Sequence, residues 1–415
     1  MPQATRARYA VLILTLLLSA IVYLDRVCIS TASLVIKSEL GLSDSQIGYV
    51  FSIYTIAYAV FEVPGGWLVD RFGARWMLTR IVVAWSLMTA ATGLSWSFSS
   101  LFVIRMLFGM GEAGAYPSMA WVYSRWLPAR DRGRAFGLTV MAGLLGASLT
   151  QPAVVALLGQ MSWRHIFPLF GAVGIVWTVV WFTWFRDNPG AHPAVNQSEL
   201  RIIGSNSVEA GHAKVPWRRL WNNGSLRALC LMYCGTIYGW YFYLTWLPQY
   251  LYRARGFDLK AVGWLSALPL LSIAVGVLTG GWVSDILVTK WGPRLGRRIP
   301  GLVGLPVAAA AIVRAITAPD PVGAALAVAV AAGFSALGVA PAWATCLDIG
   351  RRNAGVVSGA MNTFGNLGGA LSPIVVGILL DRWHSWNAPL YTVAVLYLAA
   401  AAAWLWIDPE EKLEG

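Results

Sequence analysis

The sequence predicts an all-α membrane protein whose twelve transmembrane helices form two bundles of six. Three observations predict this fold. Of the 415 residues, 57% are hydrophobic and 12% are charged, with a mean hydropathy of +0.61, whereas soluble domains contain about 25% charged residues. Apolar stretches of the length that spans a bilayer, about 20 residues, recur twelve times. The second half of the chain also repeats sequence patterns of the first half, which predicts two related bundles.

The twelve apolar stretches define the predicted helices in order. They cover residues 10–33, 46–70, 76–95, 98–124, 134–158, 165–186, 227–251, 261–285, 300–317, 322–348, 354–380 and 387–407. The first stretch follows Arg6 and Arg8, as in a secretory signal peptide. It continues past Leu24 into charged residues and lacks a small-residue cleavage site, so we interpret it as the first membrane span.

Positive charges are distributed unevenly over the loops between these spans. With the N-terminus inside, the inner loops hold Arg71, Arg75 and Arg80 and the cluster at 125–134. The outer loops hold Lys37, Arg164, Arg253, Arg255, Lys260 and Arg382. Inner loops of membrane proteins carry the excess of Lys and Arg. The sequence therefore predicts a multi-pass protein of the plasma (inner) membrane with both termini in the cytoplasm. Topology and anionic lipid then explain the net charge of +12 without a nucleic-acid partner.

The chain divides at a polar segment. We expect residues 1–186 to form the first six-helix bundle, 187–225 a cytoplasmic linker and 226–415 the second bundle. The sequence Gly65–Asp70 at the end of the second span recurs as Gly280–Asp285 at the end of the eighth. A duplicated six-span unit is typical of transporters that hold substrate between their halves near the membrane midplane.

Four charged residues lie inside the apolar stretches of the first half: Asp25, Arg26, Arg105 and Glu112. At the bilayer centre each costs roughly 2.5–3.5 kcal/mol, and such residues are functional by default. Arg105 and Glu112 are two helical turns apart and share one face, whereas Asp25 and Arg26 point about 100° apart. A guanidinium binds a carboxylate with two hydrogen bonds, so we expect Arg26 and Arg105 to hold an organic anion. The alternative is a salt-bridge cluster that only joins two helices, but buried ion pairs are weak stabilisers.

The stretch from Gly66 to Arg75, GWLVDRFGAR, resembles the signature loop between the second and third helices of the major facilitator superfamily. Within it the chain resembles the anion:cation symporters, which include bacterial D-galactonate and hexuronate:proton symporters, vesicular glutamate transporters and sialin. The resemblance covers nearly the whole chain, and its further motifs are Tyr23–Arg26, Arg105-x6-Glu112, Leu244–Pro248 and Asn362–Gly369. It implies Asp25 and Glu112 as proton carriers, and a gating latch formed by Asp70, Arg71, Arg75 and Asp285.

The second half offers neutral polar groups where the first half is charged. The position aligned with Glu112 is Ala336. Amide side chains both donate and accept hydrogen bonds, so we expect the second half to read substrate hydroxyls. The predicted substrate contacts besides the arginines are Tyr23, Tyr58, Gln151, Gln249, Trp343, Asn362 and Asn366. Each of these can equally be a contact between helices.

Glu62, in the second span, has no role assigned by these arguments. Two interpretations stay open: a third titratable group, or a protonated acid bonded to a neighbouring helix.

We expect a proton-coupled importer of an organic anion that works by alternating access, with a sugar acid such as an aldonate or hexuronate as the favoured substrate. The alternatives are an aromatic, dicarboxylic or amino-acid anion as substrate, or a membrane nutrient sensor that does not transport. An enzyme is not expected, because the sequence shows no set of nucleophile, base and orienting residue. The expected partners are the anion, protons and lipid; no cofactor or metal is expected, and the chain is predicted to act as a monomer.

Overall fold

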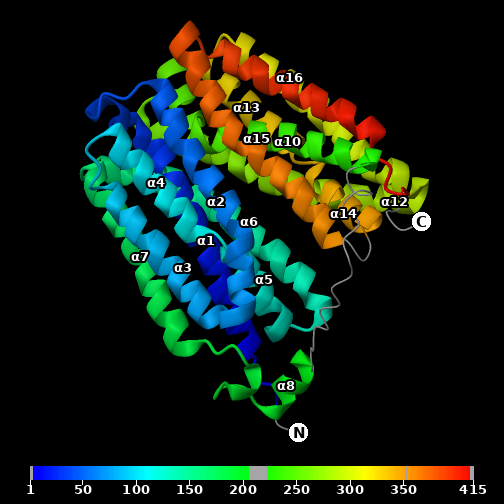
Figure 1. Ribbon diagram of the computed structural model, residues 1–415. Coiled ribbons are helices and arrows are strands. Elements are labelled where there is room, and N and C mark those ends of the chain that lie inside the picture. Colours follow the sequence, from blue (N-terminus) through cyan, green and yellow to red (C-terminus); the bar gives the residue numbers. More distant parts are fainter. Residues whose placement is uncertain (1–2, 205–221, 351–353, 412–415) are drawn as a thin grey trace. The chain divides into compact units, whose positions relative to one another are not determined.

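The computed structural model describes residues 3–204, 222–350 and 354–411, and the regular structure in these ranges is helical (Figure 1). The first half contains α1 (Ala7–Glu39), α2 (Asp44–Phe72), α3 (Ala74–Thr92), α4 (Phe98–Glu112), α5 (Ala115–Trp126), α6 (Ala129–Leu158), α7 (Trp163–Trp184), the short turn η1 (Pro189–Ala191) and α8 (Gln197–Ile203). The second half contains α10 (Gly224–Thr245), α11 (Leu247–Gln249), η2 (Tyr250–Ala254), α12 (Leu259–Thr317), α13 (Pro321–Ser335), α14 (Val339–Gly350), α15 (Ala354–Trp383), α16 (Asn387–Ala403) and η4 (Trp404–Trp406).

Among the described residues, seven helical segments are long and apolar enough to cross a membrane, and α2 is an eighth if its 47° bend is counted within one span. Two predicted spans, 261–285 and 300–317, fall in α12, where Gly292 interrupts the helical backbone with a φ of 80°. The predicted span 98–124 is divided into α4 and α5, and the span 322–348 into α13 and α14. Breaks within spans therefore account for part of the difference from twelve continuous helices.

The break between α4 and α5 has a clear local cause. Gly114 adopts a left-handed backbone with φ of 92°, a conformation that glycine accepts without steric cost. A Cβ atom on Gly114 would lie 2.9 Å from the Cα of Gly65, and one on Gly65 would lie 2.8 Å from the Cα of Gly114. The two glycines thus let α2 approach the break directly. Glu112 is the last residue of α4, immediately before this contact.

The chain forms two compact units, Met1–Ala32 with Ile53–Gly211 and Ser33–Ser52 with His212–Gly415. This division departs from the predicted boundaries at residues 33–52, which are the ends of α1 and α2. Backbone contacts with α15 explain the difference. A Cβ on Gly48 would lie 2.3 Å from the carbonyl oxygen of Pro373, and one on Gly377 would lie 2.5 Å from that of Asp44.

In the first unit, α3 packs against α4 and α7 around large buried aromatic side chains, including Trp85, Phe108 and Trp181. In the second unit, α10 packs against α15 and α12 against α13. These buried faces are where polar side chains are costly, so the charged residues inside the first unit require a specific explanation.

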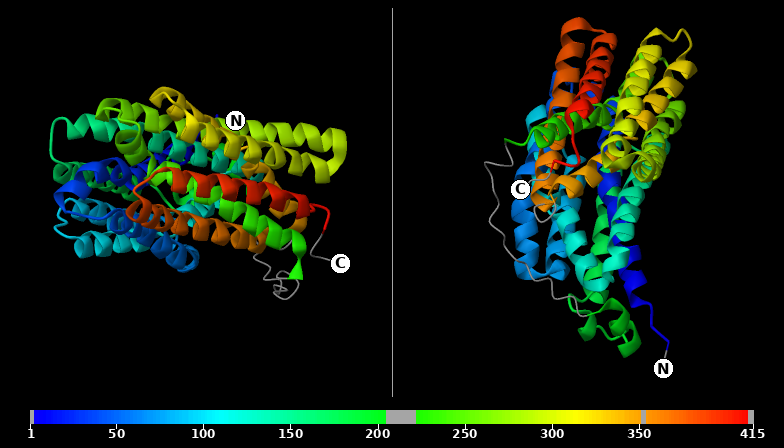
Figure 2. Two further views of the ribbon diagram at one scale, coloured as in Figure 1. Left: turned by 90° about the horizontal axis from the view of Figure 1, so that it is seen from above. Right: turned by 90° about the vertical axis from the view of Figure 1, so that its right-hand side faces the viewer.

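The first part of the predicted linker is folded onto the first unit, and residues 205–221 lie outside the described residues. Helix α8 lies beside the start of α1 (Figure 2). The buried Glu199 carboxylate accepts hydrogen bonds from the backbone N–H groups of Arg6 (3.1 Å) and Arg8 (3.2 Å) and from Nη1 of Arg8 (2.8 Å). This contact fixes the start of the linker to the N-terminal helix.

Candidate substrate and proton site

An arginine of α1 and a glutamate of α4 form a buried pair inside the first unit. The Nε of Arg26 donates to Oε1 of Glu112 at 2.6 Å, and Nη2 of Arg26 contacts the same oxygen. The Glu112 side chain is 1% exposed and that of Arg26 is 16% exposed. The structure therefore brings together two of the four charged residues that the sequence predicts for the site.

Three tyrosine rings surround the Arg26 guanidinium. Its central carbon lies 5.3 Å from the ring centroid of Tyr23, 5.5 Å from that of Tyr54 and 4.8 Å from that of Tyr58. Distances within about 6 Å allow cation–π attraction. Tyr23 and Tyr58 are among the residues predicted to contact the substrate. Tyr54 was missed, although it is four residues before Tyr58 and so shares its helix face.

The other two charged residues lie close by but face different partners. Asp25 is fully buried, and its Oδ2 accepts a hydrogen bond from Nε1 of Trp85 on α3 at 3.1 Å. Arg105 is 1% exposed and lies 4.0 Å from the Phe108 ring centroid and 5.5 Å from that of Tyr54. Tyr54 is thus in contact with both arginines. Asp25 turns toward α3 while Arg26 turns toward Glu112, as the 100° between neighbouring helix positions predicts.

Three charged groups of this cluster have an unused bonding position. Oδ1 of Asp25, Nη1 of Arg105 and Oε2 of Glu112 are buried and have no hydrogen-bond partner among the described residues. Buried polar atoms are nearly always partnered, and an unpartnered one costs about 1–3 kcal/mol, more if charged. An arrangement selected only to hold helices together would use these atoms. The cluster can instead accept a further ligand or a proton.

Glu62 extends the cluster along α2. It is half-buried, and Oη of Tyr58, one turn earlier, donates to its Oε1 at 3.2 Å. Tyr58 therefore contacts Arg26 through its ring and Glu62 through its hydroxyl.

Comparison with known proteins identifies the family. A model of the Major Facilitator Superfamily matches residues 15–373. The chain belongs to the Major Facilitator Superfamily. It is similar to a probable sulfoacetate transporter of Cupriavidus necator, with 36% identity over 99% of this chain and 96% of the relative. It is also similar to a probable galactarate/D-glucarate transporter of Escherichia coli K12 (30% identity, covering 99% and 96%) and to a D-galactonate transporter of Escherichia coli O6:H1 (30% identity, covering 95% and 94%).

The fold agrees with this assignment. A crystal structure of a bacterial homologue of the human lysosomal transporter Spinster matches 96% of this chain and 94% of its own, with a TM-score of 0.76 and 20% sequence identity. At this identity the likeness shows the fold alone. This facilitator is a multi-pass membrane transporter, as the resemblance carried by the signature loop implied, and it is not an enzyme.

Two predicted amide contacts of this facilitator are bonded to neighbouring helices. In the first unit, the buried Gln151 donates from Nε2 to Oγ of Ser30 at 3.3 Å and accepts at Oε1 from the hydroxyl of Thr31. In the second unit, the buried Gln249 donates from Nε2 to Oγ of Ser33 at 3.0 Å. Each amide is occupied by a contact with α1.

The other predicted contacts of the second unit lie on α14 and α15. Trp343 is 39% exposed and donates from Nε1 to Oη of Tyr233 on α10 at 3.2 Å. Asn362 and Asn366 are half-buried and one turn apart on α15. Tyr233, which was not predicted, links these elements, because its ring also closely approaches Gly365 on α15.

The predicted gating residues are placed within their own units. In the first unit Asp70 is exposed, and Arg71 lies 5.8 Å from the Trp67 ring centroid. Arg75 donates from Nη2 to the carbonyl oxygen of Phe182 at 2.7 Å, and its backbone N–H donates to Asp187 at 2.9 Å.

In the second unit, Nη1 of Arg297 contacts Oδ1 of Asp285 at 2.9 Å, and Nε of the same arginine contacts Asp348 at 3.3 Å. The partners Asp187, Arg297 and Asp348 were not predicted, because these contacts join different helices or connections and helix periodicity does not pair such residues.

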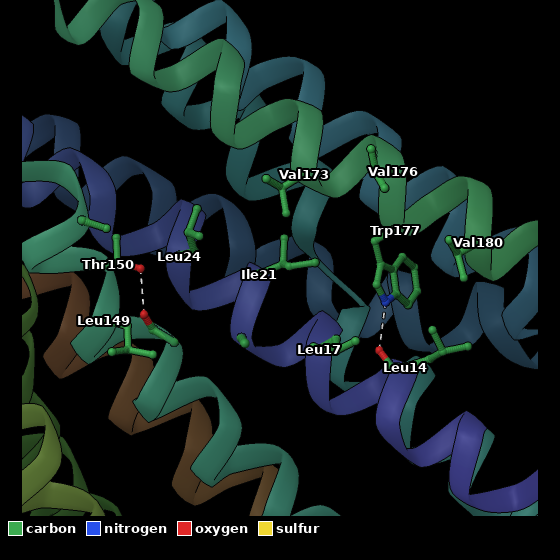
Figure 3. Close-up of a pocket in the computed structure, with 13 residues that line it drawn as sticks. Leu14, Leu17, Ile21, Leu24, Leu149, Thr150, Val173, Val176, Trp177 and Val180 are labelled. Atoms are coloured by element: carbon green, nitrogen blue, oxygen red, sulfur yellow. Dashed lines mark hydrogen bonds between the residues drawn. The ribbon is translucent and has the colours of Figure 1, made fainter. Parts of the chain in front are cut away.

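A groove of about 510 Å³ on the first unit is apolar and does not suit an anion (Figure 3). It lies between α1, α6 and α7, and leucine, isoleucine and valine side chains dominate its lining. The hydroxyl of Thr150 donates to the carbonyl oxygen of Gly146 at 2.7 Å, and Nε1 of Trp177 donates to that of Leu14 at 2.9 Å. No charged side chain lines this groove, so the Arg26–Glu112 cluster is the better candidate site.

Proposed function

We propose that this facilitator is a secondary active transporter that couples import of an organic anion to protons by alternating access. The observation that carries the proposal is the buried Arg26–Glu112 pair with the open bonding positions of Glu112 and Arg105 beside it. The names of the relatives support an anionic substrate, since sulfoacetate, galactarate, glucarate and galactonate are all small organic acids.

The arginines supply the anion-binding groups. Nη1 of Arg105 lacks a partner among the described residues, and the rings around Arg26 hold its guanidinium in place. A guanidinium binds a carboxylate through two parallel hydrogen bonds. We infer that the substrate carboxylate binds at Arg105 and competes with Glu112 for Arg26.

That competition provides the coupling. Glu112 is stabilised as a carboxylate by Arg26 in a buried place. A buried carboxylate that loses its cation binds a proton, because the charged form is no longer compensated. An anion that takes over Arg26 thereby favours proton uptake at Glu112. Asp25, which is buried and bonded to Trp85, is the second proposed proton carrier.

The favoured substrate is a sugar acid, with Trp343, Asn362 and Asn366 as neutral groups for its hydroxyls. A dicarboxylate or sulfonated acid is the second candidate, and the 36% identity to the sulfoacetate transporter relative favours it. The plasma (inner) membrane, cytoplasmic termini and inward flux belong to this proposal, supported by the distribution of Lys and Arg over the loops.

Uptake into proteoliposomes tests the proposal. Labelled D-galactonate, D-glucarate and sulfoacetate are offered separately, with an inward proton gradient, without one, and with a protonophore. We expect one of these anions to accumulate above equilibrium only when the gradient is present. Equal accumulation with and without the proton gradient would contradict proton coupling. Failure of all three anions to enter would contradict the substrate assignment.

A further inference from the structure

A polar cavity lies within the second unit. It has a volume of about 380 Å³ and is formed by the end of α1, the connection to α2, and the α11–η2 segment. Ligand pockets typically measure about 300–1,000 Å³. Its lining includes Lys37, Gln249, Tyr252 and Arg253. The predicted topology puts this cavity, here called the outer anion pocket, on the outer side of the membrane.

Two cations of the outer anion pocket share one carboxylate. Nη1 of Arg253 lies 2.6 Å from Oδ1 of Asp44, and Nζ of Lys37 contacts the same oxygen. The Asp44 side chain is 7% exposed, whereas those of Lys37 and Arg253 are 22% and 37% exposed. Lys37 and Arg253 line the cavity, whereas the Asp44 carboxylate is buried beside them. This carboxylate supplies one negative charge to two positive charges, so the three groups together keep a charge of about +1.

The other acidic groups nearby do not line this cavity. Asp381 on α15 accepts hydrogen bonds from the backbone N–H groups of Asp44 (3.0 Å) and Ser45 (2.8 Å), so it caps the start of α2. Glu39 is exposed at the end of α1 and lies outside the lining. The cavity surface thus presents positive charge.

A buried amide fixes the arginine in position. Gln249 is fully buried, accepts from Nη1 of Arg253 at 3.1 Å through its Oε1, and donates to Ser33 at 3.0 Å. Arg253 also contacts Asp44 through Nη2 at 3.1 Å. Its guanidinium is therefore held at one place while its side chain stays partly exposed to the cavity, a preorganised arrangement for a planar anionic group.

We propose that the outer anion pocket captures the carboxylate or sulfonate group of the organic anion before it reaches the Arg26–Glu112 cluster. The inference rests on the proposed function, because it takes the substrate to be an anion that arrives from the outer side. Clefts with charge of one sign raise the local concentration and association rate of an oppositely charged substrate, and salt screens this effect. Loss of the pocket's charge raises KM and leaves the maximal rate unchanged.

The test compares Lys37→Gln with Lys260→Gln in proteoliposome uptake of D-galactonate and sulfoacetate. Lys260 is the matched control, because it is an exposed lysine predicted on the same side that does not line the pocket. At low ionic strength we expect Lys37→Gln to raise KM about ten-fold with the maximal rate kept, and this difference to shrink in high salt. Lys260→Gln should match the native protein.

Arg253→Lys supplies a second variant, since it keeps the charge but loses the planar fork that Gln249 and Asp44 hold. It should keep the salt dependence of the native protein while raising KM. A KM and salt dependence in Lys37→Gln equal to those of the control would overturn the capture pocket. The proposed function fails separately, by loss of gradient-driven accumulation in the native protein, which does not depend on Lys37.

Discussion

Among the described residues of the first unit, two buried arginine–glutamate pairs can be compared, and they differ in the number of hydrogen bonds that the glutamate accepts. Glu199 is 0% exposed and Glu112 is 1% exposed, and their arginine partners Arg8 and Arg26 are 11% and 16% exposed. Both oxygens of Glu199 accept hydrogen bonds, two from backbone N–H groups and one from Arg8. Glu112 accepts from Arg26 at Oε1, and its Oε2 has no partner among the described residues.

This difference separates a structural pair from a functional one. A buried carboxylate whose oxygens all accept hydrogen bonds stabilises one packing of the helices around it. Replacing that carboxylate breaks these hydrogen bonds and lowers the stability of the fold. A buried charge with an unused bonding position keeps capacity for a ligand or a proton, at a cost that stability alone does not explain. Burial and charge are similar in both pairs, so the number of hydrogen bonds that each glutamate accepts is what separates them.

The largest expected effect concerns the arginines of the two pairs. Arg26→Lys should lower anion uptake about 100-fold, because an ammonium cannot form the paired hydrogen bonds of a guanidinium and the loss of a buried charge contact costs about 2–5 kcal/mol. Arg8→Lys is the matched control and should change uptake less than about two-fold. Initial uptake rates in proteoliposomes measure the effect of each variant. Equal losses of uptake in Arg26→Lys and Arg8→Lys would contradict the division into a functional and a structural pair.

Stability should show the opposite ranking. Glu199→Gln leaves backbone N–H groups with fewer or weaker acceptors, so it should lower the free energy of unfolding by about 1–3 kcal/mol. Glu112→Gln removes a charge that already had an unused oxygen, and should lower thermal stability less. Melting curves of the two purified variants at one pH provide the comparison. A lower melting temperature for Glu112→Gln than for Glu199→Gln would contradict this ranking.

A smaller effect is expected at Tyr54, whose ring contacts both Arg26 and Arg105. Tyr54→Leu removes two cation–π contacts, each about 0.5–1 kcal/mol or more when desolvated, so the KM for anion uptake should rise about five- to thirty-fold. Tyr54→Phe keeps the ring and should stay close to the native KM. A loss of the same size in both variants would mean that the hydroxyl, and not the ring, is what matters.

The smallest effect is a pH dependence of the structural region around Glu199. His192 precedes α8, and its ring lies 5.5 Å from the Trp126 centroid and 4.5 Å from that of Trp184. Its Nε2 is 2.9 Å from the carbonyl oxygen of Trp184, and its Nδ1 accepts from the N–H of Ala194 at 3.1 Å. Burial lowers the pKa of His192 below its usual range, so the folded protein favours the neutral ring.

The unfolded chain then binds more protons than the folded one just below the ordinary histidine pKa of about 6.5. The stabilising contribution of His192 is complete above that pH and is lost as the pH falls below it through the lowered folded value. The melting temperature of the native protein should therefore decline by a few degrees at most between pH 7.5 and 5. His192→Gln should reduce this decline, and an unchanged pH profile in that variant would contradict the assignment.

The sequence predicted the fold class and the charged cluster, because both depend on composition and local spacing. Twelve apolar stretches and the GWLVDRFGAR motif indicate the family, and membrane-embedded charges stand out against their surroundings. The broken helix at Gly114 was not predicted, since it depends on the close approach of Gly65. The partners of Glu199 and Asp44 were missed because hydrogen bonds across 193 and 209 residues leave no trace in one sequence.

The predicted amide contacts also show that residue type alone does not identify the partner of a side chain. Gln151 and Gln249 fit a substrate site and a helix contact equally well by residue type, and only coordinates reveal the hydroxyl groups of Thr31 and Ser33 to which they are bonded.

Proton coupling at Glu112 is tested most simply in the variant Glu112→Gln. Proteoliposomes that contain this variant are assayed for accumulation of D-galactonate, D-glucarate and sulfoacetate under an inward proton gradient, and for exchange of the same anions at equal pH. If Glu112 carries the proton, accumulation is lost while exchange survives, because the anion still binds the arginines but no proton is carried at this position. Accumulation at the native level in Glu112→Gln would contradict it.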